Sequence, residues 1–120
     1  TKNSLIVKTD TLDRLLAPHG SPIVDIIKMD IEGAEEIALR GMTATIARSP
    51  HLKIFTEFYP ERIAAVSGSA QKFLRNLQDK GFSLEIIDED TSATREINDI
   101  QNMKDVLPPR EKFINILARR

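Results

Sequence analysis

Cysteine is absent from this sequence, and its absence excludes several kinds of site. A chain without thiols has no disulfide, no zinc–thiolate centre and no cysteine nucleophile. The lack of cysteine fits a reducing compartment, and the first residues do not resemble a signal peptide, so we expect a cytoplasmic protein. The chain starts at Thr1 rather than at a methionine, which leads us to expect a longer parent polypeptide.

An excess of charge of either sign is missing as well. The formal net charge is −1 and the Lys and Arg residues are scattered, so we expect neither nucleic acid nor a membrane as a partner. No apolar run approaches the roughly 20 residues that a transmembrane helix needs. What is present, 41% hydrophobic and 29% charged residues over 120 positions, is the balance of one small globular domain.

Apolar runs bounded by proline and glycine predict strands and helices in the first half of the chain. Residues 23–31 are almost continuously apolar, as expected for a strand buried on both faces of a parallel sheet. Gly33 ends this run, and the helix expected after it carries Glu36 and Arg40 at the spacing of an ion pair. The expected order is a short strand (5–7), one or two helical turns (11–16), a strand (23–31) and helical segments (34–40 and 43–48).

The second half of the chain adds three more strands. Ser69 is a suitable N-cap for a helix, and Gly81 stands where that helix should end. The expected elements are a strand (52–58), two helices (61–66 and 70–80), a strand (82–87), a polar loop (88–99), a weak helix (100–107) and a last strand (113–118). The early alternation indicates an α/β fold with parallel crossovers. The last two strands lack a long helix between them, which favours antiparallel pairing.

Acidic residues follow or end two of the predicted parallel strands. Asp30 and Glu32 come at the end of one strand, and Glu57 comes at the end of the next. Ligands in open α/β sheets bind beyond the carboxyl ends of the strands, so we expect these three carboxylates at one edge. Gly33 would let the backbone turn tightly into the following helix. A carboxylate placed there can orient a hydroxyl, bind a metal or hold an amine.

Each of these residues also has a purely structural interpretation. Asp30 could cap the next helix, and Glu32 could stabilise the start of that helix through its charge. Glu57 would cost several kcal/mol if buried without a partner, so it should either pair with Lys28 or Lys53 or face the site. Tyr59 could line a pocket or cover the core.

Five segments in series resemble the landmarks of one family. TLDRLL, VDIIKMDIEGAE, LRGM, LKIFTEFYP and LQDKGF are similar in order and spacing to those of FkbM-type methyltransferases, over about Thr9 to Gly81. The final NILARR resembles the family's last strand. The resemblance implies S-adenosylmethionine as cofactor and a Rossmann-like class I methyltransferase sheet, with parallel strands followed by an antiparallel terminal pair.

The same resemblance implies that the chain is incomplete. On the family template, residues 26–30 would be the fourth strand and residues 52–58 the fifth. The glycine-rich turn after the first strand and the acid that ends the second would both precede Thr1, and the five glycines present cannot replace them. Residues 1–120 would then be one partial domain that binds S-adenosylmethionine weakly or not at all. The exposed edge of residues 26–30 should be covered by residues 1–16 or should form a homodimer.

The resemblance also implies roles for the strand-end residues. Asp30 and Glu57 would be catalytic, and Asp30, Ile31, Glu32 and Gly33 would contact the cofactor. Glu32, Glu57 and Tyr59 would contact the substrate, and no metal ligand is assigned. The reaction would be O-methylation of a small molecule, a carbohydrate or natural-product hydroxyl, by the parent protein, with the isolated chain inactive.

A receiver-like signalling domain is the alternative. The segment PIVDIIKMDIEG resembles a phosphoacceptor strand, with Asp30 as the acceptor and Lys104 as the late lysine. A receiver needs an acidic pair and a full helix and strand before the acceptor, and only residues 5–7 with Thr9 and Asp10 are available there. The position of Asp30 therefore argues against this alternative.

Overall fold

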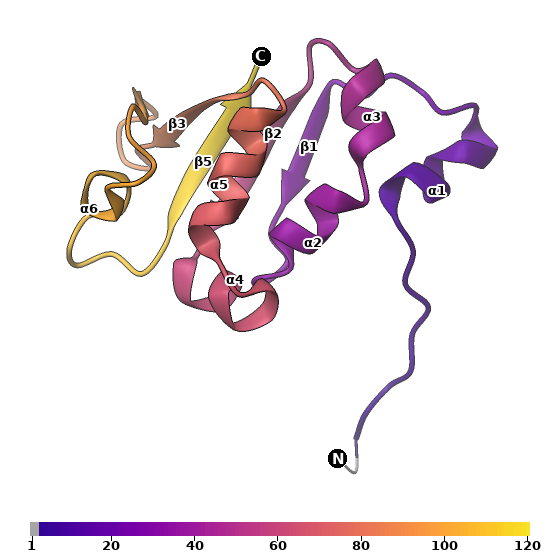
Figure 1. The fold of residues 1–120 in the computed structure, drawn as a ribbon, viewed down its shortest axis with the longest axis horizontal. Coiled ribbons are helices and arrows are strands. Elements are labelled where there is room, and N and C mark those ends of the chain that lie inside the picture. Colours follow the sequence, from indigo (N-terminus) through magenta and orange to yellow (C-terminus); the bar gives the residue numbers. More distant parts are fainter. Residues whose placement is uncertain (1–2) are drawn as a thin grey trace.

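A computed structural model describes residues 3–120 and shows a mixed α/β fold (Figure 1). Most of the predicted helices and strands are confirmed to within one to three residues at each end. None of the helices in the described part is long and apolar enough to cross a membrane. The elements in chain order are α1 (Leu12–Leu16), the 3-10 turn η1 (Ala17–His19), β1 (Ile26–Met29), α2 (Glu35–Arg40), α3 (Thr43–Arg48), β2 (Lys53–Phe58), α4 (Pro60–Ser67), α5 (Ala70–Asp79), β3 (Ser83–Ile87), β4 (Thr94–Glu96), α6 (Met103–Val106) and β5 (Ile114–Arg119).

The five strands form one sheet in the order β1-β2-β5-β3-β4. β1 and β2 are parallel, whereas β5 is antiparallel to both of its neighbours, β2 and β3. β1, β2 and β3 therefore run in the same direction, and their carboxyl ends share one edge of the sheet. The expected antiparallel pairing of the last two predicted strands is confirmed, and β5 also inserts between β2 and β3.

Only one face of the sheet is covered by helices, and the core lies under them (Figure 1). β2 alternates accordingly: Ile54 and Phe58 are fully buried, whereas Phe55 and Glu57 point to the other face and are partly exposed. Burying an aliphatic or aromatic side chain of this kind contributes about 1.5–3 kcal/mol. The period-two pattern of β2 is what fixes which side chains face the helices.

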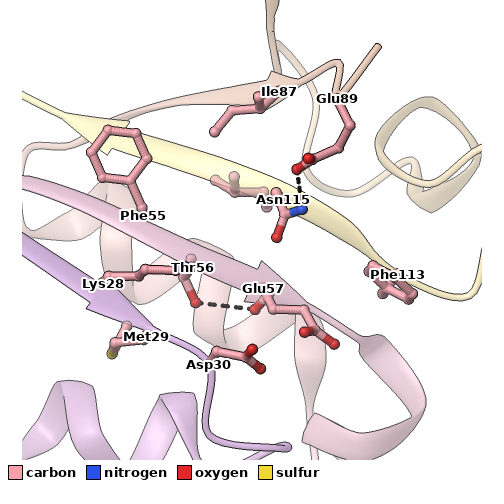
Figure 2. Close-up of a pocket in the computed structure, with 11 residues that line it drawn as sticks. Lys28, Met29, Asp30, Phe55, Thr56, Glu57, Ile87, Glu89, Phe113 and Asn115 are labelled. Carbon is pink, nitrogen blue, oxygen red and sulfur yellow. Dashed lines mark hydrogen bonds between the residues drawn. The ribbon is translucent and has the colours of Figure 1, made fainter. Parts of the chain in front are cut away.

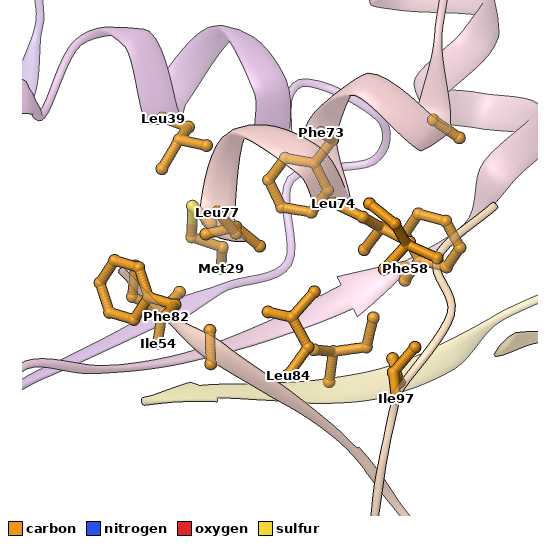
Figure 3. Close-up of a cluster of buried hydrophobic side chains, with 14 of the residues drawn as sticks. Met29, Leu39, Ile54, Phe58, Phe73, Leu74, Leu77, Phe82, Leu84 and Ile97 are labelled. Carbon is orange, nitrogen blue, oxygen red and sulfur yellow. The ribbon is translucent and has the colours of Figure 1, made fainter. Parts of the chain in front are cut away.

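Helix α5 supplies much of the apolar surface over the sheet. Phe73, Leu74 and Leu77 are fully buried and pack into the same core as Ile54 and Leu84 (Figure 3). The predicted ends of this helix are also confirmed. The Ser69 hydroxyl accepts a hydrogen bond from the N–H of Lys72 at 3.1 Å, and Gly81 has φ +88°, a conformation that favours glycine.

The strand expected over residues 23–31 differs from the prediction in two ways. Only Ile26–Met29 pair as a strand, and that strand is not buried on both faces. Ile26 is 63% exposed, because the face opposite the helices is open and β1 forms the edge of the sheet. An apolar run indicates that a segment tends to be buried, but the elements that would cover it belong to other parts of the sequence.

The predicted short strand over residues 5–7 is wrong. Leu5, Ile6 and Val7 are 85%, 97% and 64% exposed and belong to an extended stretch that leads away from the sheet (Figure 1). Residues 3–16 therefore do not cover the free edge of β1, and Thr1 and Lys2 lie outside the described residues. A strand forms only with a pairing partner, and this stretch has none in the described part of the chain.

Two further local predictions need correction. The polar loop expected over residues 88–99 contains β4, which pairs antiparallel with β3 through Glu85 and Glu96 and their neighbours. The ion pair expected between Glu36 and Arg40 is not formed within residues 3–120. Glu36 is only 2% exposed and instead accepts a hydrogen bond from Asn76 Nδ2 at 2.6 Å, because α2 turns this side chain toward α5.

Asp13 of α1 caps α3 from a distance of more than thirty residues along the chain. Its carboxylate accepts hydrogen bonds from the N–H groups of Ala44 and Thr45 at 2.9 and 2.8 Å and from the Thr45 hydroxyl at 2.6 Å. Burial alone would raise the pKa of Asp13, but these hydrogen bonds and the nearby Arg48 cation outweigh it and lower the pKa. This cap fixes α1 against α3.

Candidate functional site

A cavity of about 340 Å³ lies where the strands β1 and β2 end and β5 begins (Figure 2). It opens on the face of the sheet that the helices leave free. Its walls combine carboxylates, an amide and a lysine with aromatic and aliphatic surface. The lining residues are Lys28, Met29, Asp30, Phe55, Thr56, Glu57, Ile87, Glu89, Phe113, Asn115 and Ile116.

The cavity brings Asp30 and Glu57 together, as the sequence predicted. β1 and β2 are parallel with Met29 opposite Thr56, so the next residue of each chain segment reaches the same edge. Burial raises the pKa of Glu57, and a hydrogen bond to Asp30 and the charges of Asp30 and Glu35 raise it further.

The structural interpretations of these two acids do not hold. The N-cap of α2 is Ala34, and no side chain caps that helix, so Asp30 is not a cap. Within residues 3–120, Glu57 forms no ion pair with Lys28 or Lys53. Lys28 lines the cavity without neutralising Glu57. Both carboxyl groups are therefore available to a ligand in the cavity.

The turn between β1 and α2 carries the other predicted residues. Gly33 has φ +105°, and a Cβ added there would lie 2.6 Å from the backbone oxygen of Arg62, so glycine is required for both reasons. Glu32 has φ +58°, pairs with the Arg62 guanidinium and is not among the residues that line the cavity. The N–H of Ile31 donates to Glu35 Oε1 at 3.3 Å. The structure thus places Glu32, Gly33 and Ile31 beside the acid pair but not in the cavity wall.

Tyr59 lies next to the cavity rather than in its wall. Its ring packs against Phe113 with centroids 6.1 Å apart, and the Arg62 guanidinium lies 4.6 Å from the Tyr59 ring centre. Phe113 does line the cavity. Tyr59 can therefore contact a ligand only beyond the present wall, or support the wall through Phe113.

Several cavity residues were not singled out from the sequence. Glu89 is the second residue after β3, and it accepts a hydrogen bond from Asn115 Nδ2 at 2.5 Å. The signal for Glu89 was present, because a third strand with the same direction ends just before it. Asn115 and Phe113 come from or precede β5, and only the insertion of β5 between β2 and β3 brings them here.

A second cavity of about 580 Å³ adjoins the first. The two share Ile87, Glu89, Phe113 and Asn115, and the second extends over the loops that follow β3 and precede β5. The two hollows together offer room for a ligand larger than the acid pair alone would contact. Within residues 3–120 there is no group of three or more His, Asp or Glu side chains arranged to hold a metal ion.

Comparison with known proteins identifies one family. No curated protein matches the chain, and no solved structure matches it. A family model described as the methyltransferase FkbM domain matches residues 1–84, which include α1, the acid pair and β2 through α5. This match gives no support to the receiver-like alternative. The chain therefore belongs to the FkbM methyltransferase family.

Proposed function

We propose that this chain forms the acceptor side of an S-adenosylmethionine-dependent O-methyltransferase. The observation that carries the proposal is that Asp30 and Glu57 line the same cavity at the carboxyl ends of two adjacent parallel strands. This is where ligands bind in open α/β sheets. Family membership supplies the methyl transfer, and the pair supplies a means of handling the proton of a hydroxyl.

The proposed chemistry needs few protein groups. S-adenosylmethionine, when bound, supplies a methyl carbon carrying a good leaving group. Methyl transfer to a hydroxyl releases the proton of that hydroxyl, and a carboxylate of this chain would accept it. Because its pKa is raised, Glu57 is a stronger base than an ordinary glutamate, while Asp30 orients the hydroxyl. The protein otherwise contributes alignment of the reacting atoms.

The cavity walls favour a hydroxyl-rich acceptor such as a carbohydrate or natural product. Carboxylate and amide oxygens accept hydrogen bonds from hydroxyls, and Glu57, Glu89 and Asn115 present such groups. Phe55 and Phe113 offer apolar surface to the carbon skeleton. We propose Glu32 and Tyr59 as outer contacts, because both lie beside the cavity rather than in it. A cytoplasmic location remains our prediction.

The residues present fit only part of the cofactor. A cavity of about 340 Å³ lies at the lower end of the range for ligand pockets, about 300–1,000 Å³. The Cα of Gly33 faces the backbone of Arg62 and leaves no cradle there. Asp30, Ile31, Glu32 and Gly33 would accordingly contact the methyl-bearing end, and other parts of a longer polypeptide would hold the rest.

The strand order supports this division. β1, β2, β3 and β5 would correspond to the fourth, fifth, sixth and seventh strands of a Rossmann-like class I methyltransferase sheet, with the reversed strand inserted as observed. Residues 1–120 would then be a single partial domain. The free edge of β1 is where further strands of that sheet would pair.

Two measurements test the proposal. Calorimetric titration of the isolated chain with S-adenosylmethionine should show weak binding or none, and micromolar binding would contradict the placement of the cofactor. In the full-length parent, Asp30→Asn should lower turnover more than it lowers thermal stability. Asp25→Asn is the matched control, because Asp25 is an exposed acid at the opposite end of β1. Unchanged turnover in Asp30→Asn would remove Asp30 from the mechanism.

A further inference from the structure

Two adjacent buried glutamates begin helix α2. Glu35 and Glu36 are each only 2% exposed, and in each the Oε1 atom accepts a hydrogen bond while the buried Oε2 atom has no partner in the described part of the chain. Burying a carboxylate with an unsatisfied oxygen is costly, by several kcal/mol if it stays charged. A residue kept in spite of this cost is a candidate for a role in the site. The two glutamates differ in which groups they contact.

Glu35 reaches back to the turn that carries Asp30. Its Oε1 accepts the Ile31 N–H at 3.3 Å, so the side chain closes a loop around the backbone that follows β1. The same turn holds the Ala34 N–H to the Ile31 oxygen at 3.3 Å. Glu35 is also close enough for its charge to act on Glu57. Glu35 therefore acts on the acid pair in two ways: its hydrogen bond holds the backbone next to Asp30, and its charge affects the pKa of Glu57.

Glu36 points the other way. Its Oε1 accepts from Asn76 of α5 at 2.6 Å, which ties α2 to α5 inside the helical layer. Glu36 does not contribute to the electrostatic environment that shifts Glu57, whereas Glu35 does. The chain thus contains two carboxylates with the same burial and hydrogen-bond count, of which only one adjoins the site.

We propose that Glu35 is a positioning residue for the acid pair: it fixes the turn after β1 and thereby sets where the Asp30 carboxyl lies relative to Glu57. The inference rests on the proposed role of Asp30 and Glu57. Asp30 and Glu57 lie close together because β1 and β2 pair with Met29 opposite Thr56. If the turn after β1 were displaced by one residue, Asp30 would no longer lie at the sheet edge beside Glu57.

Four charged groups near Glu57 come from three parts of the fold. Asp30 lies at the end of β1, Glu35 lies on α2, and Lys28 of β1 lines the same cavity. Glu89 follows β3, where it is bonded to Asn115. Of these, Asp30 and Glu35 raise the pKa of Glu57, after the larger effect of burial. Removing the Glu35 charge should therefore let Glu57 lose its proton at lower pH.

The experiment compares four variants of the chain by NMR. Glu35→Gln keeps an oxygen for the Ile31 N–H and removes the charge. Glu35→Ala and the similarly sized Glu35→Leu remove both, and Glu36→Gln is the matched control. The readouts are the side-chain carboxyl titration of Glu57 and the exchange protection of the Ile31 amide. Neither readout depends on methyl transfer. The role of Glu35 can therefore be refuted while the proposed function stands, and the proposed function can be refuted while the role of Glu35 stands.

We expect Glu35→Gln to shift the Glu57 titration to lower pH while the Ile31 amide stays protected. In Glu35→Ala the protection should fall about fivefold, the effect of one ordinary hydrogen bond. Glu36→Gln should change neither readout, although its effect on unfolding should be similar to that of Glu35→Gln. Unchanged protection of the Ile31 amide in Glu35→Ala, or an unchanged Glu57 titration in Glu35→Gln, would overturn the proposal, as would an equal Glu57 shift in Glu36→Gln. If Glu35→Ala does not fold, Glu35→Leu, which fills more of the buried space and also lacks an acceptor, takes its place in the amide-exchange comparison.

Discussion

Replacement of Gly33 by alanine should be one of the most damaging single-methyl changes in this chain. Two separate features of the structure oppose a side chain there. The backbone has φ +105°, which L-residues rarely adopt, and the new Cβ would lie 2.6 Å from the oxygen and 2.8 Å from the carbon of the Arg62 carbonyl. Because the obstacle is backbone of α4 rather than a flexible side chain, the turn or the helix must shift.

The magnitude can be divided into these two parts. A non-glycine residue at such a φ costs about 1–2 kcal/mol, and the forced displacement of packed backbone costs about 1–3 kcal/mol more. We therefore expect about 3 kcal/mol in total for Gly33→Ala. Gly68→Ala is the matched control, since Gly68 has φ +90° with nothing within 4 Å of the new Cβ. The control should lose only the first part, about 1–2 kcal/mol.

Urea denaturation followed by circular dichroism measures both variants on the same scale. The difference between them isolates the contact with Arg62, and we expect it to be about 2 kcal/mol with an unchanged m-value. Equal losses in Gly33→Ala and Gly68→Ala would refute the reasoning. Such a result would mean that α4 moves aside without cost, and that Gly33 is required only for its backbone conformation.

Three further predictions concern charge and the free edge. Because the folded pKa of Glu57 is raised, the chain should lose stability as pH rises from about 4.5 through that pKa, and Glu57→Gln should abolish this loss. An equally steep dependence of the urea-derived unfolding free energy on pH in Glu57→Gln would contradict this. Asp13→Ala should lower the unfolding free energy by about 1–2 kcal/mol at neutral pH. Because the folded pKa of Asp13 is lowered, this difference should vanish as pH falls well below 3.8, and a pH-independent difference in thermal melts would exclude the proposed cap. If the free edge of β1 pairs two copies, Ile26→Lys should shift sedimentation toward the monomer, and a variant that sediments like the original chain would argue against pairing there.

The local pattern of the sequence determined most of the elements and part of the site. Apolar periodicity, Ser69 and Gly81 were enough to place α5 and its ends, because these signals act within a few residues. The positions of Asp30 and Glu57 also followed from the sequence, since the residues at the carboxyl ends of adjacent parallel strands reach one edge whatever the rest of the fold does.

Tertiary structure alone decided what depends on partners distant in the chain. The order β1-β2-β5-β3-β4 brought Asn115 and Phe113 to the cavity, and a strand's own residues do not specify which strands it will lie between. The same holds for burial: within residues 3–120, Leu5–Val7 has the composition of a strand but pairs with no other segment, and Ile26 lies on a face that no helix covers. Backbone pairing and burial each require two segments in contact. The sequence pattern of one segment shows only that it can be paired and buried, and it does not show which segment will be its neighbour.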